Sequence, residues 1–175
     1  CSSDLLLVTL QVLFSLQSIS REREMVSTLE EDLELKTSAV KFLEIFATRT
    51  YELATISPDI IQSLQITSGD WGTVGFTFLV HYTVDGVPQV AKEVVESINL
   101  IDLSITFRVI EGDLLDVYNS FRFLLKLTPN ILSGSVLHWT LEYEKPSNDT
   151  PDPTSLMKEV IQVSKDVDAF VGSLI

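Results

Sequence analysis

The chain has 175 residues, of which 25 are acidic and 12 basic, giving a formal net charge of −13. Hydrophobic residues make up 45% of it, which is near the globular norm and excludes a disordered chain, and the length fits one domain. Such an acidic chain repels phosphate, so we expect no nucleic-acid partner and no anionic membrane surface. A single cysteine, Cys1, excludes an internal disulfide and a cysteine-based zinc site, and no other motif predicts a metal or a cofactor.

Residues 1–24 differ from the rest of the chain. Residues 5–16, LLLVTLQVLFSL, form an apolar run that is shorter than the ~20 residues needed to span a bilayer, so we expect no integral membrane segment. A secretory signal would carry basic residues before this run, but Asp4 stands there. We interpret residues 1–24 as an N-terminal extension, disordered or cleaved. An upstream extension or gene-model artefact, a degraded signal peptide and a membrane-associating arm all stay open.

The domain is then expected over residues 25–175, with a cytoplasmic location, or a secreted one if residues 1–20 act as a signal peptide. Its first element is a strand over 26–36, because apolar and charged residues alternate there with period 2. Ser38 can cap a short helix, SAVKFLEIFA, which ends at Ala47. The apolar side of that helix is expected to carry Val40, Leu43, Phe46 and Ala47. A second helical stretch around residues 51–55 ends before Pro58.

Residues 60–145 show almost only strand and turn patterns. Apolar residues alternate with polar ones over successive segments, and an Asp85-Gly86 turn is typical of a β-hairpin. Six or seven antiparallel strands in hairpin order are predicted, at about residues 60–67, 74–82, 89–98, 103–110, 121–127 and 137–143 besides the first. A loop with three glycines, Gly69, Gly72 and Gly75, joins two of them.

The last segment is predicted to be a long helix. Asp152 can cap it, and Pro153 fits its first turn. Apolar residues then recur at intervals of three or four along one side, namely Leu156, Val160, Val163, Val167, Phe170 and Leu174. Only the sheet is large enough to cover such a helix, so the predicted class is α+β. Periodicity alone favours a solid core beneath the helix over a cavity, because protein interiors are close-packed.

Several strings in this sequence resemble a known plant family. They are GDWGTVG at 69–75, ITFRVIEGD at 105–113, Gly134-Ser135, WTLEYEK at 139–145 and PDPT at 151–154. Their order and spacing resemble the major latex proteins, a branch of the superfamily that includes the birch-pollen allergen and the class-ten pathogenesis-related proteins. The resemblance covers residues 25–175 and leaves out the N-terminal extension.

The resemblance implies a START-like helix-grip fold. This is a seven-stranded curved antiparallel sheet wrapped around a long C-terminal helix, with two short helices in a V and a large internal hydrophobic cavity. It therefore favours a cavity over a solid core. The side chains then expected to line the cavity are Phe76, Phe78, Val80, Tyr82, Phe107, Val109, Phe123, Leu125, Leu137, Trp139, Leu141, Tyr143, Val160 and Val163.

The function implied by the resemblance is binding or carriage of small hydrophobic plant metabolites, such as sterols, fatty acids, flavonoids and hormones. An association with plant defence and stress responses and a monomeric state are also expected. Tyr82 and Tyr143 are the favoured polar contacts, because His138 and Thr140 have the opposite strand parity and are expected to face solvent. The three glycines are interpreted as a tight turn at the cavity mouth and not as a phosphate loop, since no helix follows them.

The alternative is an enzyme of alkaloid-type metabolism that uses the same cavity. Neither histidine, His81 or His138, has a nucleophile or metal-ligand pattern beside it, so both are interpreted as surface strand residues. Lys92, Glu93 and Glu96 lie in a strand where both parities mix charged and apolar residues. If one of them reached the cavity, it would be the best candidate for a general acid or base.

Overall fold

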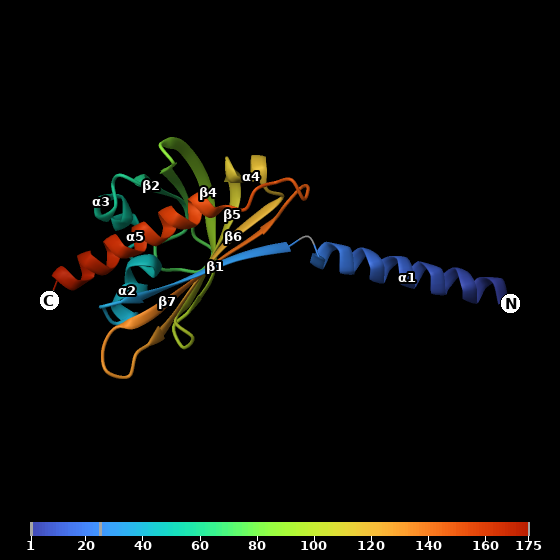
Figure 1. Cartoon of the computed structure of the whole chain (residues 1–175), viewed down its shortest axis with the longest axis horizontal. Helices are drawn as coiled ribbons and strands as arrows, with labels where there is room; N and C mark the ends of the chain where they lie inside the picture. The colour runs from blue at the N-terminus through green and yellow to red at the C-terminus, as the bar shows by residue number, and fades with distance from the viewer. Residues whose placement is uncertain (1, 25, 175) are drawn as a thin grey trace.

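A computed structural model describes residues 2–24 and 26–174 (Figure 1). Cys1, Met25 and Ile175 lie outside the described residues. Met25 is the residue at which the domain is predicted to start. The helices are α1 (Ser2–Glu24), α2 (Ala39–Ala47), the 3₁₀ turn η1 (Thr50–Glu52), α3 (Leu53–Ile56), α4 (Leu114–Val117) and α5 (Thr154–Ser173). The strands are β1 (Val26–Leu35), β2 (Ile61–Ser68), β3 (Thr77–Val84), β4 (Val87–Asn99), β5 (Ser104–Gly112), β6 (Ser120–Pro129) and β7 (Ser135–Glu144).

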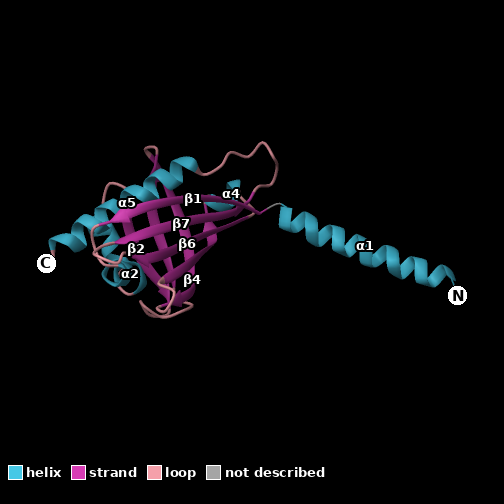
Figure 2. Cartoon of the chain, turned by 60° about the horizontal axis from the view of Figure 1, so that its bottom comes forward, coloured by secondary structure: helices cyan, strands magenta, loops and turns pink. Residues whose placement is uncertain are grey.

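The strands form one sheet in the order β1-β7-β6-β5-β4-β3-β2, and every neighbouring pair is antiparallel. The predicted α+β class, with seven antiparallel strands and a long C-terminal helix, is confirmed. Figure 2 shows α5 running across one face of the sheet. Strand β7 shows how the sequence sets this face, because its buried residues alternate with half-buried ones; the buried ones are Ser135, Leu137, Trp139, Leu141 and Tyr143.

Strands β1 and β2 are the two edges of the sheet. On β1 the leucines Leu29, Leu33 and Leu35 face the interior to differing degrees, as the alternation predicts. Exposed acidic side chains fill the positions between and beside them, namely Glu30, Glu31, Asp32 and Glu34. The edge strand β1 therefore carries a row of negative charges, three of them on its solvent side and Glu31 at an exposed position of the other face.

Helix α2 begins as predicted, because the Ser38 hydroxyl accepts a hydrogen bond from the Lys41 N–H at 3.4 Å. Its buried face differs from the prediction at one position: Val40 is 65% exposed. The face that packs inward consists of Ala39, Phe42, Leu43, Ile45, Phe46 and Ala47. The predicted start of β3 at residue 74 is also wrong. The strand begins at Thr77, and Val74 lies in the preceding loop with its side chain exposed.

Helix α5 is tied to the segments on either side of it by carboxylates. Asp168 accepts hydrogen bonds from the backbone N–H groups of Lys36 and Thr37, at 3.1 and 3.0 Å, and from the Thr37 hydroxyl at 2.7 Å. Asp166 accepts the Ser57 hydroxyl at 2.6 Å, just beyond α3. The Asp168 bonds hold the helix at the link between β1 and α2, and the Asp166 bond holds it at the end of α3.

The start of α5 differs from the prediction. Pro153 occupies the N-cap position, and no side chain caps the helix. The Asp152 carboxylate instead accepts the Tyr143 hydroxyl at 2.6 Å and pairs with Lys145 Nζ at 2.7 Å. These contacts, with Lys145 the stronger, lower the pKa of Asp152. The sequence identifies Asp152 as the residue before the helix. It does not show that the carboxylate binds Tyr143 of β7 and Lys145 instead of capping the helix.

Residues 2–24, which the sequence pattern leads us to interpret as part of a disordered or cleaved extension, form helix α1 (Figure 1). The side chains of residues 3–18 are exposed, and apolar residues surround the whole circumference. The hydroxyls of Thr9 and Ser15 donate to carbonyls one turn back, at 2.7 and 2.9 Å. Among the described residues, no helix is both long and apolar enough to cross a membrane. The assignment of this segment to an extension outside the domain stays a prediction.

Candidate ligand cavity

A cavity of about 120 Å³ lies between the inner face of the sheet, α5 and the η1–α3 segment. The sheet supplies side chains from all of its strands except β1, and the N-terminal half of α5 closes the opposite side. Seventeen residues line it: Phe46, Thr50, Leu53, Ile60, Ile61, Leu64, Phe78, Val80, Tyr82, Glu93, Phe107, Phe123, Trp139, Leu156, Glu159, Val160 and Val163. Most of this lining is apolar, and the cavity therefore favours apolar ligands.

Eight of the fourteen residues predicted for the lining are among these seventeen. They are Phe78, Val80, Tyr82, Phe107, Phe123, Trp139, Val160 and Val163. The other six are buried in the packing around the cavity and do not line it: Phe76, Val109, Leu125, Leu137, Leu141 and Tyr143. Strand parity places all twelve of the predicted strand residues on the inner face, but it cannot say where along that face the space is left open.

Aromatic clusters fill the inner face beyond the cavity. Near one end, Trp71 from the glycine loop packs on Phe76 and Phe78, with ring centroids 5.3 and 6.1 Å apart. In a second cluster, Tyr143 packs on Tyr118 and Phe121, with ring centroids 5.2 and 5.9 Å apart. The cavity is therefore smaller than the large one expected from the resemblance. A site of about 150 Å³ in another protein admits benzene, so this one suits a single ring unless side chains move.

Of the two tyrosines predicted to be polar contacts of the ligand, only Tyr82 lines the cavity. Its hydroxyl donates to the Gln89 side chain at 3.1 Å, and burial raises its pKa. Tyr143 lies outside the cavity, where its hydroxyl is held by Asp152, and burial again raises the pKa. Trp139 lines the cavity with its ring, while its indole N–H donates to Ser164 Oγ at 2.8 Å. Ser164 is a buried residue of α5 that the apolar periodicity misses.

Glu93 is the charged residue of β4 that reaches the cavity. Its cross-strand neighbours are Phe78 on β3 and Val109 on β5, which are both buried on the inner face, and residues paired across strands share a face. The side chain makes no hydrogen bond or ion pair with the described residues, so the area it exposes faces the cavity. Burial in this apolar setting raises the pKa of the Glu93 carboxyl to about 8.

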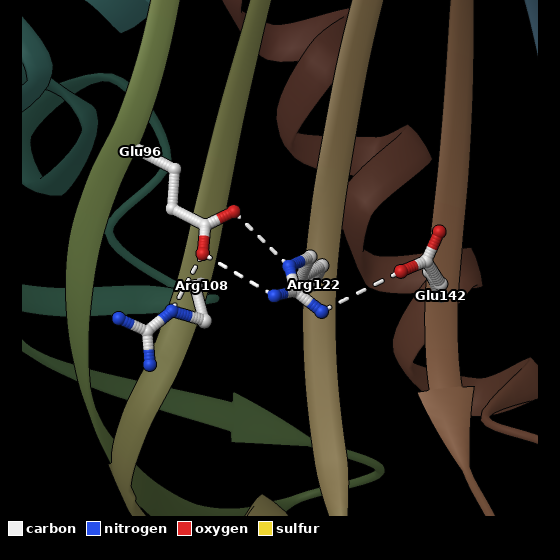
Figure 3. A network of polar contacts seen from close by, with 4 residues as sticks. All are labelled: Glu96, Arg108, Arg122 and Glu142. Atoms are coloured by element: carbon white, nitrogen blue, oxygen red, sulfur yellow. Dashed lines mark hydrogen bonds and ion pairs between the residues drawn. The ribbon is translucent and has the colours of Figure 1, made fainter. Parts of the chain in front are cut away.

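Glu96 and Lys92 lie on the opposite face of the sheet. A bulge between Val95 and Ser97 leaves Glu96 without a partner on β5. Its carboxylate accepts Arg108 Nε at 2.6 Å and Arg122 Nε at 3.0 Å, and Arg122 also pairs with Glu142 at 3.5 Å (Figure 3). Partial burial opposes ionisation of Glu96, but the arginine contacts outweigh it and lower its pKa. Lys92 pairs with Glu111 at 3.6 Å.

The histidines and Thr140 also lie on this outer face, as the sequence predicts. His81 is exposed and its Nδ1 lies 3.0 Å from Ser63 Oγ. The ring of His138 lies between Asp32, 2.7 Å from Nδ1, and Thr128, 3.1 Å from Nε2. Within the described ranges 2–24 and 26–174, no group of three or more His, Cys, Asp or Glu side chains is arranged to hold a metal ion.

The glycine loop joins β2 to β3 without a following helix. Gly69, Gly72 and Gly75 all have positive φ, between 78° and 91°, a region that other residues rarely adopt. A Cβ on Gly72 would meet the Thr48 side chain at 3.1 Å, so the loop packs closely on the end of α2. None of the three glycines lines the cavity. Their expected place at its mouth therefore stays a prediction.

Sequence reasoning also misses part of the lining. Ile61 and Leu64 come from edge strand β2, where a bulge between Ile61 and Ser63 breaks the alternation. Thr50 and Leu53 come from the short η1–α3 segment, which is too brief for a periodic pattern. Glu159 comes from the side of α5 that the sequence marks as polar.

An antiparallel sheet folded around a long helix, with a mostly apolar cavity between them, defines a ligand-binding helix-grip fold. The chain belongs to the pathogenesis-related protein Bet v 1 family, whose model matches residues 24–173. The family resemblance found in the sequence is thereby confirmed.

Among its relatives is MLP-like protein 34 of Arabidopsis thaliana, which is 42% identical over 153 residues. The match covers 86% of this chain and 48% of that protein, so the chain spans about half of this relative's length. The crystal structure of major latex-like protein 151 from Panax ginseng superposes with a TM-score of 0.80 at 29% identity, covering 83% of this chain and 97% of that one. Norcoclaurine synthase from Thalictrum flavum shares the fold at 18% identity, with a TM-score of 0.73 and coverage of 85% and 87%.

Proposed function

We propose that this protein binds or carries small hydrophobic plant metabolites in the cavity between the sheet and α5. The observation that carries the proposal is the mostly apolar lining of this cavity. Ligand surface removed from water there contributes roughly 25 cal/mol per Å² to binding. Sterols, fatty acids, flavonoids and hormones are the ligand classes that the family resemblance implies. Ligands larger than one ring require movement of the lining side chains.

The cellular role is proposed on the same family basis. Membership of a family described as pathogenesis-related supports an association with plant defence and stress responses. We propose a monomer in the cytoplasm, with secretion as the alternative if residues 1–20 act as a signal peptide.

Displacement of an uncharged fluorescent apolar probe, N-phenyl-1-naphthylamine, tests the binding role. We expect the probe to enter the cavity and to be displaced by members of at least one ligand class. Val160→Phe adds a ring to the cavity wall and should weaken probe binding about tenfold or more. Val40→Phe adds the same atoms at an exposed site on α2 and serves as the control. Equal probe binding by both variants, or no uptake by the wild type, would refute the proposal.

An enzymatic role is the second candidate, and the position of Glu93 favours it. A carboxyl with a pKa of about 8 can donate or accept a proton near neutral pH. The fold shared with norcoclaurine synthase supports only the architecture, since the identity is 18%. Mass spectrometry of bound ligands after long incubation separates the two roles. Recovery of unchanged ligand supports a carrier, whereas a product that the wild type forms and Glu93→Gln does not would establish an enzyme.

A further inference from the structure

The polar groups of the cavity wall differ in whether they have a partner inside the protein. The hydroxyls of Tyr82 and Thr50 donate to Gln89 and to the Phe46 carbonyl, at 3.1 and 2.8 Å. The indole N–H of Trp139 is held by Ser164. The carboxyls of Glu93 and Glu159 have no such partner among the described residues, and Glu93 is the one on the sheet, paired across strands with the buried Phe78 and Val109. The Glu93 carboxyl is half-buried and faces the apolar cavity without a partner in the described part of the chain, so it is available to a ligand.

The charges around Glu93 are all of its own sign or neutral. Tyr82 faces it from β3, Glu159 lines the cavity from α5, and Asp113 lies just beyond the end of β5, close enough to act on Tyr82. None of the seventeen described lining residues is Lys, Arg or His. The cavity therefore holds no cation of its own, and the net charge of −13 gives the whole chain a field that attracts one.

We propose that the cavity selects small apolar molecules that carry a basic nitrogen, and that the Glu93 carboxylate is the counter-ion of the bound ammonium group. This inference rests on the proposed binding function and names its ligand class. The apolar lining receives the hydrocarbon part of the ligand, and the volume of about 120 Å³ suits one ring with a short side chain. An ammonium N–H donates to the carboxylate, which supplies the partner that Glu93 lacks.

The number of protons released on ligand binding depends on the protonation state of Glu93 before the ligand enters. Near pH 7 the Glu93 carboxyl keeps its proton, because burial raises its pKa to about 8. When a ligand enters as an ammonium ion, the carboxyl O–H breaks and that proton passes to solvent. When a neutral amine enters, the same proton moves to the nitrogen and no proton is released. For ammonium ligands at pH 7, about 0.9 proton should leave per ligand bound.

Affinity for amines should therefore depend on pH in a definite way. It should rise as the pH approaches 8, because less work is then needed to deprotonate Glu93. It should fall again above the pKa of the ligand's own ammonium group, which lies above about 9 for such amines. The affinity for a neutral ligand of the same shape should show neither this rise nor this fall with pH.

Titration calorimetry with benzylamine and its uncharged isostere ethylbenzene tests the inference. Wild-type protein at pH 8.5 should bind benzylamine at least about tenfold more tightly than Glu93→Gln does, while both bind ethylbenzene equally. The matched control is Glu111→Gln, which removes an exposed carboxylate of the outer face and should change neither affinity. Titrations at pH 7 in buffers of different ionisation enthalpy measure the released proton.

The outcomes separate the inference from the function on which it rests. Binding of ethylbenzene without selective, Glu93-dependent binding of benzylamine would overturn the ligand class and leave the carrier role standing. Failure of both compounds to bind, together with no uptake of the fluorescent probe, would refute the carrier role itself. Equal loss of benzylamine affinity in Glu93→Gln and Glu111→Gln would show a general charge effect and would also overturn the inference.

Discussion

Replacing Glu93 with Gln should change how the stability of the fold depends on pH. Glutamine keeps the size and polarity of the side chain but cannot ionise. In the wild type, the carboxyl is protonated in both the folded and the unfolded chain below its ordinary pKa of 4.5. Between 4.5 and about 8 the unfolded chain loses this proton while the folded chain keeps it. Stability must therefore fall as the pH rises through this window, and the loss is complete above 8.

The magnitude follows from the same two pKa values. At 1.36 kcal/mol for each pKa unit, the difference between 4.5 and about 8 corresponds to an upper limit of about 5 kcal/mol. Because Glu93 is only half-buried, the cost of ionising it is lower than this limit, and we expect about 2–4 kcal/mol. The free energy of unfolding of Glu93→Gln should therefore gain this amount relative to the wild type between pH 4 and pH 9.

Urea denaturation followed by tryptophan fluorescence at several pH values measures this difference. Comparing the two proteins at each pH cancels the titration of every other group, provided that those groups are unchanged. A difference in unfolding free energy that stays constant from pH 4 to pH 9 would refute the reasoning, because it would show that Glu93 has an ordinary pKa and access to solvent.

Three further substitutions test contacts that fix the fold around the cavity. Ser164→Ala leaves the buried indole N–H of Trp139 without an acceptor and should cost about 1–3 kcal/mol of unfolding free energy. Asp168→Ala removes three hydrogen bonds at Lys36 and Thr37 and should cost about 2–4 kcal/mol, measured by urea denaturation. Glu96→Gln should cost about 1–2 kcal/mol at pH 7, and the cost should shrink as the pH falls below 4.5, since the arginines stabilise the ionised form.

Each of these has a matched control. Ser155→Ala on the same helix checks Ser164, and Lys165→Ala, at an exposed site, checks Asp168. Glu111→Gln, an exposed carboxylate on the same face of the sheet, checks Glu96. A control that destabilises as much as its partner would show that the measured effect does not come from the contact. For Glu96, a cost independent of pH would contradict the ionic account.

The sequence predicts the sheet well because period-2 patterns are repeated on strand after strand. Strand β7 alternates without a break, so its inner residues can be assigned from the sequence alone. For helix α2 the sequence predicts the N-cap residue correctly, but it predicts the buried face only in part. Val40 matches the 3.6-residue spacing, yet the tertiary contacts bury Phe42 and Ile45 on the neighbouring positions instead.

The cavity is predicted less completely, and β4 shows why. Its inner positions include Gln89 and Glu93, while its outer positions include the apolar residues Val90 and Val94. Hydrophobicity therefore carries no signal for the orientation of this strand, and a bulge after Val95 reverses its parity. Only the register with β3 and β5, set by apolar neighbours on both sides, turns Glu93 inward.

The acidic side chains of β1 have a consequence for the surface of the molecule. An open sheet ends in a strand whose outer backbone groups can pair with another chain, and this pairing is a route to aggregation. On β1, Glu30, Glu31, Asp32 and Glu34 stand along that edge, so a second copy aligned there would meet a row of like charges. The excess of negative charge thus acts as a barrier to the growth of the sheet from one molecule to the next. An apolar interior large enough to hold a ligand can then coexist with an open edge in a crowded solution.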